Sequence, residues 1–143
     1  MREVPGWDVY HFGQAVQAAE RSKDPDTQVG CVIVNDDHHI ISTGYNGFPP
    51  NVDETSEMWA SGIKHDRVIH AEMNAIAAAA KNGHSLKGCT LYVTYAPCMC
   101  RGCAPLIVSA GIRRVVHGPI IWKDDFAKAF KLFCEAGVRA EKA

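Results

Sequence analysis

The 143-residue sequence has no apolar run that approaches the roughly 18–20 residues of a membrane span. Its first residues, MREVPGWDVYHFG, lack the charged and then apolar composition of a signal peptide. Internal repeats, low-complexity tracts and obvious linkers are also missing. We therefore expect one domain over residues 1–143 that carries no membrane segment and resides in the cytoplasm.

An excess of positive charge is missing as well. The chain has 15 Lys and Arg against 16 Asp and Glu, and the basic residues are scattered singly or in short pairs. Proteins that hold long nucleic acids usually carry a basic stripe, because neutralising phosphates supplies most of their affinity. The composition therefore favours a small substrate over nucleic acid.

The six cysteines are not expected to form a disulfide framework, because nothing in the sequence points to secretion. Three of them stand alone and are expected to be small buried residues of the core: Cys31, Cys89 and Cys134. The other three fall close together and require a different explanation.

Apolar periodicity, turn residues and capping residues predict strands that alternate with helices. In the first helix we expect Asp8 as the N-cap, with Val9, Phe12, Val16 and Ala19 on one face. The expected helices span residues 8–22, 71–81, about 98–110 and 124–135. The expected strands span residues 29–34, 40–45, 90–94, 114–117 and 138–140.

Residues 46–64 are polar and rich in glycine, proline and asparagine, which predicts a long loop of a kind that is often functional. After Pro97 a turn is expected to open a helix that ends near Gly111. Because strands alternate with helices in the second half, we expect parallel strands joined by crossovers. The predicted fold class is α/β, with a sheet between two helical layers.

Two short motifs carry residues suited to a metal site. His70 and Glu72 lie two apart at the start of the alanine-rich helix, although a lone histidine there is more often structural. Cys98, Cys100 and Cys103 lie where a loop leads into a helix, which suits a thiolate-rich zinc site. A structural zinc or a reactive redox pair would give a similar cysteine pattern.

The two motifs together favour catalytic zinc. Zinc held by one histidine and two cysteines keeps a fourth position for water, whose pKa it lowers from about 15.7 towards roughly 7. Glu72, on the first helical turn, is placed to move protons from that water to a ring nitrogen and to departing ammonia. A His-x-Glu followed by Pro-Cys-x-x-Cys is the signature of zinc deaminases.

Further segments lie in order along the chain: Arg21–Pro25, Gln28–Gly30, Gly44–Gly47, His70–Ile76, Leu91–Thr94 and Ala110–Ile112. With the two motifs, they resemble the deoxycytidylate (dCMP) deaminases of the zinc-dependent cytidine deaminase superfamily, from about residue 7 to residue 138. The resemblance implies a three-layer α/β/α sandwich with a mixed five-stranded sheet. It also implies hydrolysis of dCMP to dUMP and ammonia, a reaction at a cyclic amidine that supplies thymidylate synthesis, with one catalytic Zn²⁺ per subunit.

The same resemblance implies a homohexamer that dCTP activates and dTTP inhibits, through a separate nucleotide site with Mg²⁺. It assigns Asn46 to the sugar, and Arg21 with Ser22 to the phosphate. Ala71 and Trp122 complete the expected substrate contacts, the latter where family members commonly carry a tyrosine that packs on the base. Without the resemblance, Asn46 is an ordinary turn residue, Arg21 a solvated helix end, and Trp122 a core or surface residue.

The cysteine spacing departs from the family pattern, since four residues rather than two separate Cys98 from Cys103. We favour His70, Cys98 and Cys103 as the ligands, because Cys98 keeps the Pro-Cys dipeptide and some related deaminases use the longer spacing. The alternative is Cys100 with Cys103, which restores the usual gap and shares a helical face. Coordination by all three cysteines would close the site and make it structural.

Three other functions stay open from the sequence. A deaminase that accepts both dCMP and dCTP is the nearest of them. A nucleic-acid deaminase, such as a tRNA adenosine editor, shares the zinc motif but is expected to be more basic. A zinc-stabilised binding module without turnover would leave Glu72 without a role.

Overall fold

The computed structural model describes residues 1–143 and contains one five-stranded sheet. Its strands, in spatial order, are β2 (Ile40–Tyr45), β1 (Gly30–Val34), β3 (Thr90–Val93), β4 (Arg114–His117) and β5 (Arg139–Lys142). Strand β1 pairs antiparallel with β2 and β3, whereas β3 with β4 and β4 with β5 are parallel. The mixed sheet with its parallel second half confirms the predicted topology.

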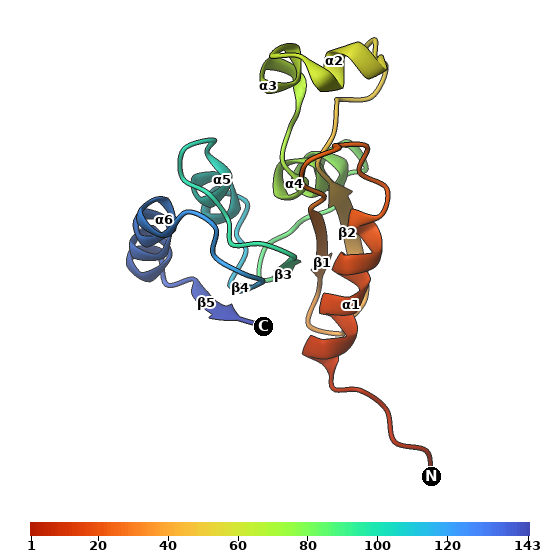
Figure 1. The fold of residues 1–143 in the computed structure, drawn as a ribbon. Helices are drawn as coiled ribbons and strands as arrows, with labels where there is room; N and C mark the ends of the chain where they lie inside the picture. The colour runs from red at the N-terminus through yellow and green to blue at the C-terminus, as the bar shows by residue number, and fades with distance from the viewer.

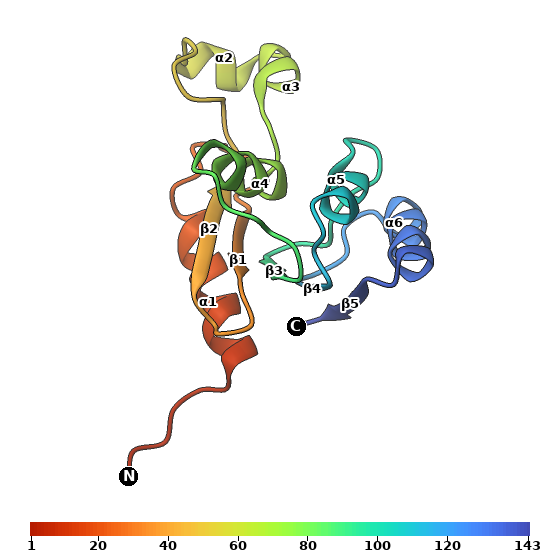
Figure 2. The same ribbon diagram turned by 180° about the vertical axis from the view of Figure 1, so that it is seen from behind.

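Helices cover both faces of this sheet (Figures 1 and 2). The side chains of Val32 and Val34 pack with Ala15 of α1, whereas Cys31 and Ile33 belong to the larger core on the opposite face. That alternation follows from the two-residue period of a strand, and it confirms the three-layer sandwich. No helix has the length and apolarity that a membrane crossing requires. The helices of the two layers are α1 (Trp7–Ala19) on one face, and α4 (Ala71–Lys81), α5 (Cys103–Ser109) and α6 (Lys123–Ala136) on the other.

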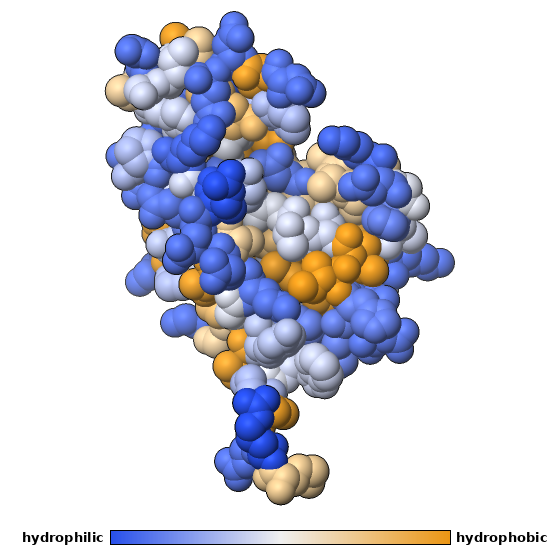
Figure 3. Space-filling view, turned by 90° about the vertical axis from the view of Figure 1, so that its right-hand side faces the viewer, coloured by the Kyte–Doolittle hydropathy of each residue, from blue (hydrophilic) through white to orange (hydrophobic).

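The segment expected to be a long loop is only partly irregular. The Thr55 side chain caps a first helix, and Trp59 is 7% exposed because it stacks on Phe48 with ring centroids 4.7 Å apart. The loop prediction was therefore wrong for part of residues 46–64, since a polar composition hid a cap and an aromatic pair. Figure 3 shows that this projecting part of the molecule, at the top, is mostly hydrophilic on the face in view. Its two short helices are α2 (Ser56–Ala60) and α3 (Ile63–Arg67).

Helix α1 buries only part of the face predicted, since Phe12 packs against the core and Ala19 is half-buried but the two valines are exposed. His11 and Ala15 are fully buried, whereas Val9 and Val16 are 70% and 47% exposed. A Cβ on Gly30 would lie 1.9 Å from the Ala15 carbonyl oxygen, so the backbones of α1 and β1 are in direct contact. The helix therefore presents its small residue to the sheet, and this close approach outweighs the apolar periodicity.

Asp8 is also not the N-cap, a position that Gly6 occupies. Its carboxylate instead accepts hydrogen bonds from the Tyr92 hydroxyl at 2.7 Å and from Arg114 Nη1 at 2.8 Å. The Arg114 guanidinium lowers the pKa of Asp8 to about 2. Asp8 thus fastens the start of α1 to β3 and β4.

The isolated cysteines divide into two groups. Cys31 and Cys89 are buried as expected, but Cys134 is exposed, so the core prediction is wrong for it. Helix α6 buries Phe133, and the next residue is rotated by about 100° towards solvent. Gly137, with φ 73°, ends this helix as predicted.

We predict that Gly44→Ala destabilises the protein by about 1–3 kcal/mol, the usual cost of overpacking. A Cβ at this position of β2 would lie 2.4 Å from the Ala71 carbonyl oxygen and 2.5 Å from the Ala75 nitrogen, so α4 has to shift. Urea unfolding of the variant measures the change. The control is Gly13→Ala in α1, where a Cβ meets nothing within 4 Å and a gain of about 0.5–1 kcal/mol is expected. Equal stability of the two variants would contradict the prediction.

Candidate metal centre and active site

A cavity of about 470 Å³ lies where α3 faces the start of α4 and the loops that precede α5 and α6. Its volume falls within the roughly 300–1,000 Å³ of small-molecule sites. The N-terminal ends of α4 and α6 and several connecting loops contribute its wall, so residues far apart in sequence meet there.

Three potential metal ligands converge at this cavity. His70 Nδ1 lies 3.4 Å from Cys98 Sγ and 3.3 Å from Cys103 Sγ, and all three atoms lie within 4.8 Å of one another. His70 precedes α4, Cys98 lies in the loop after β3, and Cys103 is the first residue of α5. One imidazole nitrogen and two buried sulfurs at these separations fit the donor set of a catalytic zinc site.

The loop that carries the cysteines turns Cys98 inward and Cys100 outward. The Asp125 carboxylate accepts hydrogen bonds from the backbone nitrogens of Met99 at 2.8 Å and Cys100 at 3.0 Å. Cys98 is 4% exposed, whereas Cys100 is exposed. The sulfur of Cys100 lies within 4.8 Å of potential ligand atoms of Cys98 and Asp125, and it does not belong to the cluster that contains His70. Helix α5 begins only at Cys103, so the helical face that Cys100 and Cys103 were considered to share does not form.

The two sulfurs shift each other's pKa in opposite directions. The Cys103 thiol lowers the pKa of Cys98 to about 4, and the same contact raises the pKa of Cys103 well above its usual range. A hydrogen bond to Cys98 raises the pKa of His70. The arrangement stabilises a thiolate, which is the form of cysteine that binds a metal.

Glu72 lies on the first turn of α4 and lines the same cavity. It is 4% exposed, and Oε2 lies 3.9 Å from Cys103 Sγ. Burial raises the pKa of its carboxyl to about 7. A carboxyl that titrates near neutral pH is suited to take up a proton and return it within one catalytic cycle.

Three of the five expected substrate residues line the cavity: Asn46, Ala71 and Trp122. Trp122 is 61% exposed and immediately precedes α6, which leaves its ring free to pack on a ligand. Asn46 is 6% exposed, and its amide holds the surrounding loop. Its Oδ1 accepts from the Val29 nitrogen at 2.8 Å, and its Nδ2 donates to the Thr27 oxygen at 2.9 Å.

The two residues expected at the phosphate do not line this cavity. Arg21 is exposed on the short turn after α1, and no side-chain hydrogen bond or ion pair holds it. Ser22 is half-buried, and its hydroxyl donates to the Asn46 carbonyl oxygen at 2.9 Å. Ser22 therefore supports the loop that carries Asn46.

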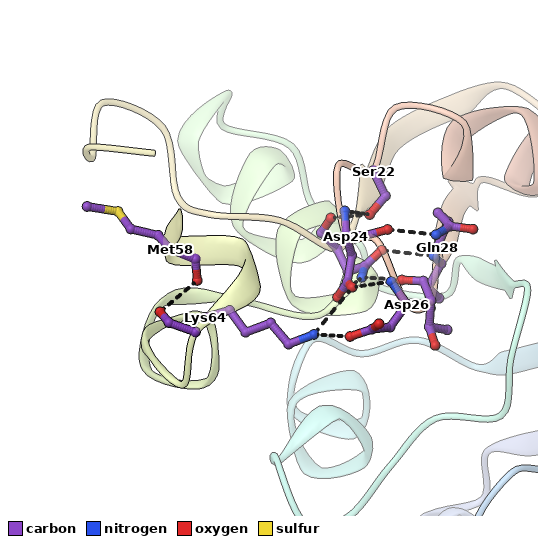
Figure 4. Close-up of polar contacts among 10 residues, drawn as sticks. Ser22, Asp24, Asp26, Gln28, Met58 and Lys64 are labelled. Carbon is purple, nitrogen blue, oxygen red and sulfur yellow. Dashed lines mark hydrogen bonds and ion pairs between the residues drawn. The ribbon is translucent and has the colours of Figure 1, made fainter. Parts of the chain in front are cut away.

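Two cationic side chains at the cavity carry no sequence signal and were not predicted. Lys64 of α3 forms ion pairs with Asp26 and, at 3.6 Å, with Asp24 (Figure 4). Arg101 donates from Nη1 to the His65 carbonyl oxygen at 3.2 Å. Both contacts tie α3 to segments distant in the sequence, and only the folded chain brings them together.

An α/β sandwich that places an imidazole and two thiols beside a buried carboxyl in one cavity defines the class of zinc-dependent base deaminases. Residues 5–119 match the family described as "Cytidine and deoxycytidylate deaminase zinc-binding region". The chain is 40% identical to the deoxycytidylate deaminase of Homo sapiens over 144 residues, which cover 95% of this chain and 79% of that protein. The chain therefore belongs to the cytidine and deoxycytidylate deaminase family.

Solved structures agree with this fold. The dCMP deaminase of cyanophage S-TIM5, in complex with dCMP and dUMP, superposes with a TM-score of 0.80 at 24% identity, covering 99% of this chain and 100% of that one. A tRNA:A34 deaminase superposes with a TM-score of 0.62 at 24% identity, covering 95% and 99%. The same architecture thus occurs in proteins whose substrates differ widely, so the site has to decide the substrate.

We predict that Glu72→Gln stabilises the metal-free protein at pH 8 by up to about 3 kcal/mol. Because burial raises the folded-state pKa of Glu72 to about 7, ionising this carboxyl costs stability as the pH rises from the unfolded value of 4.5 through 7. The neutral amide avoids that cost, so the gain should vanish near pH 4. Urea unfolding of the reduced, chelator-treated protein at both pH values measures it. A gain of the same size at both would contradict the burial argument.

Proposed function

We propose that this protein is a zinc-dependent deaminase that converts dCMP and water to dUMP and ammonia. The observation that carries the proposal is the convergence of His70, Cys98 and Cys103 beside the buried Glu72 in a nucleotide-sized cavity. Similarity to relatives named deoxycytidylate deaminases supports dCMP as the substrate.

The proposed ligands are His70 Nδ1 and the sulfurs of Cys98 and Cys103. A zinc ion in such a donor set keeps a fourth position for water and lowers the pKa of that water towards about 7. Asp125 keeps Cys98 turned inward through its two backbone hydrogen bonds, and the fixed start of α4 sets the position of His70.

Glu72 is the proposed catalytic residue. Its carboxylate would accept a proton from the attacking water and deliver it to the ring nitrogen beside the amino group. It would then take the remaining proton of the hydroxyl added to the ring carbon and give it to the amino group, so that the C–N bond breaks and ammonia leaves. Burial, which raises the pKa of this carboxyl, favours the protonated form through which the transfer passes. Its burial keeps bulk water from competing for the proton.

The remaining proposed contacts concern the substrate. Trp122 lies at the cavity with an exposed indole that can stack on a pyrimidine, and Ala71 and Asn46 line the wall near Glu72. Asn46 is proposed to contact the sugar. The family resemblance alone supports Arg21 with Ser22 for the phosphate, and neither residue lines this cavity.

A dual dCMP and dCTP deaminase is the second candidate, because the two substrates share the base and sugar and differ only in the number of phosphates. The cavity volume and the net charge of −1 support a free nucleotide over a long nucleic acid. A spectrophotometric panel of dCMP, dCTP, CMP and deoxycytidine tests this proposal. Failure on every cytosine nucleotide would overturn the assignment.

The family resemblance also supports a homohexamer, activation by dCTP, inhibition by dTTP and a regulatory Mg²⁺. Exposed apolar side chains on α1, among them Val9, Tyr10 and Val16, are compatible with contacts between subunits. A cytoplasmic location is proposed on the composition of the sequence. Sedimentation with and without each effector tests the assembly.

We predict that Glu72→Gln retains zinc and lowers kcat for dCMP by at least about 100-fold, because removing a positioned proton-transfer group costs about 10²–10⁴-fold. Zinc content by elemental analysis and initial rates by absorbance measure the two effects. Activity equal to the wild type would refute the proposed mechanism. Loss of zinc along with activity would instead place Glu72 among the ligands.

We predict that Cys98→Ser loses most of its zinc, whereas Cys100→Ser retains about one ion per subunit. The reason is that Cys98 Sγ faces His70 and Cys100 does not. The two variants form a matched pair, since each removes one thiol from the same loop. Retention of zinc by Cys98→Ser with loss by Cys100→Ser would reverse the ligand assignment, and loss in both would indicate a closed, structural site.

A further inference from the structure

Arg101 is a cation at the cavity whose charge is not neutralised. It is exposed, lines the cavity and forms no ion pair. Its one side-chain hydrogen bond runs from Nη1 to the backbone oxygen of His65 at 3.2 Å. A guanidinium has five N–H donors, so most of them stay available to a ligand while this bond fixes the position of the group.

The other lysine or arginine side chain that lines the cavity, that of Lys64, is already held in ion pairs. Lys64 pairs with both Asp24 and Asp26, and its side chain is only 15% exposed (Figure 4). These two carboxylates outnumber the single ammonium, so the group as a whole does not attract an anion. Arg101 is therefore the side chain at the cavity with a free positive charge.

Arg101 belongs to the loop that departs from the deaminase signature. It lies between the proposed ligands Cys98 and Cys103, in the loop that is two residues longer than the Pro-Cys-x-x-Cys signature. Gly102, with φ 83°, turns the chain into α5 directly after it. The longer loop thus adds a guanidinium at the rim of the cavity that holds His70 and Glu72.

We propose that Arg101 binds the 5′-phosphate of the substrate and makes this enzyme select nucleotides over nucleosides. The inference rests on the proposed deamination of dCMP and adds the group that recognises its charged end. With the base at Glu72, in the buried part of the cavity, the phosphate extends towards the exposed rim where Arg101 lies. Arginine suits this role because its planar fork matches two phosphate oxygens.

The test compares kcat and KM for dCMP and deoxycytidine in Arg101→Ala. Charge-assisted hydrogen bonds contribute about 1.5–3 kcal/mol, so kcat/KM for dCMP should fall roughly 10- to 100-fold, mainly through KM. The value for deoxycytidine should stay within about twofold. Binding of dUMP and of deoxyuridine by calorimetry gives the same comparison without turnover, and Arg101→Lys should recover part of the loss.

The matched control is Arg67→Ala. Arg67 is exposed, donates to a backbone oxygen, that of Asp53 at 3.3 Å, and does not line the cavity. Its removal should leave both substrates unaffected. Zinc content of each variant shows whether the loop has kept its fold.

Three outcomes would overturn the inference: Arg101→Ala weakens dCMP and deoxycytidine equally, it weakens neither, or Arg21→Ala alone produces the selective loss. The last of these would assign the phosphate to the turn after α1. Failure of the proposed function looks different, since the wild-type protein would then deaminate no cytosine nucleotide at all.

Discussion

Two hydrogen bonds to one carboxylate decide which cysteine reaches the metal site. Asp125 of α6 accepts from the backbone nitrogens of Met99 and Cys100, and this holds the loop with Cys98 turned towards His70. A loop with four residues between its two ligands has many conformations, so it needs a fixed point in its middle. Helix α6 supplies that point, although no residue of α6 belongs to the cluster of His70, Cys98 and Cys103.

The other half of the site depends on how closely α4 approaches the sheet. Gly44 of β2 leaves no room for a Cβ against the α4 backbone, and the Ser42 hydroxyl donates to the Ala75 oxygen at 2.6 Å. The alanines of α4 permit this contact, and the contact fixes the helix start that carries His70 and Glu72. Small residues far from the cavity therefore set the geometry of the reacting groups.

The parts of the structure that could be predicted are those that a short stretch of the sequence determines by itself. Helix α4 has the bounds expected from its alanine-rich sequence, and the alternation of strands and helices gave the parallel half of the sheet. The burial of Ala15 in place of Val9 and Val16 could not be predicted, because it depends on the contact of Ala15 with Gly30. The same holds at the cavity, where Arg101 reaches the rim through a bond to α3, a helix that the polar sequence of residues 46–64 concealed.

The link between Asp8 and Arg114 has a consequence for the order of folding. It joins residues 106 positions apart, and Arg114 also pairs with Glu141 of β5 at 2.8 Å. Closing so long a loop costs chain entropy that only the completed sheet can offset. We therefore expect the first turn of α1, which carries Asp8, to become fixed only once β4 and β5 are in place, whereas Ala15 can pack on β1 earlier.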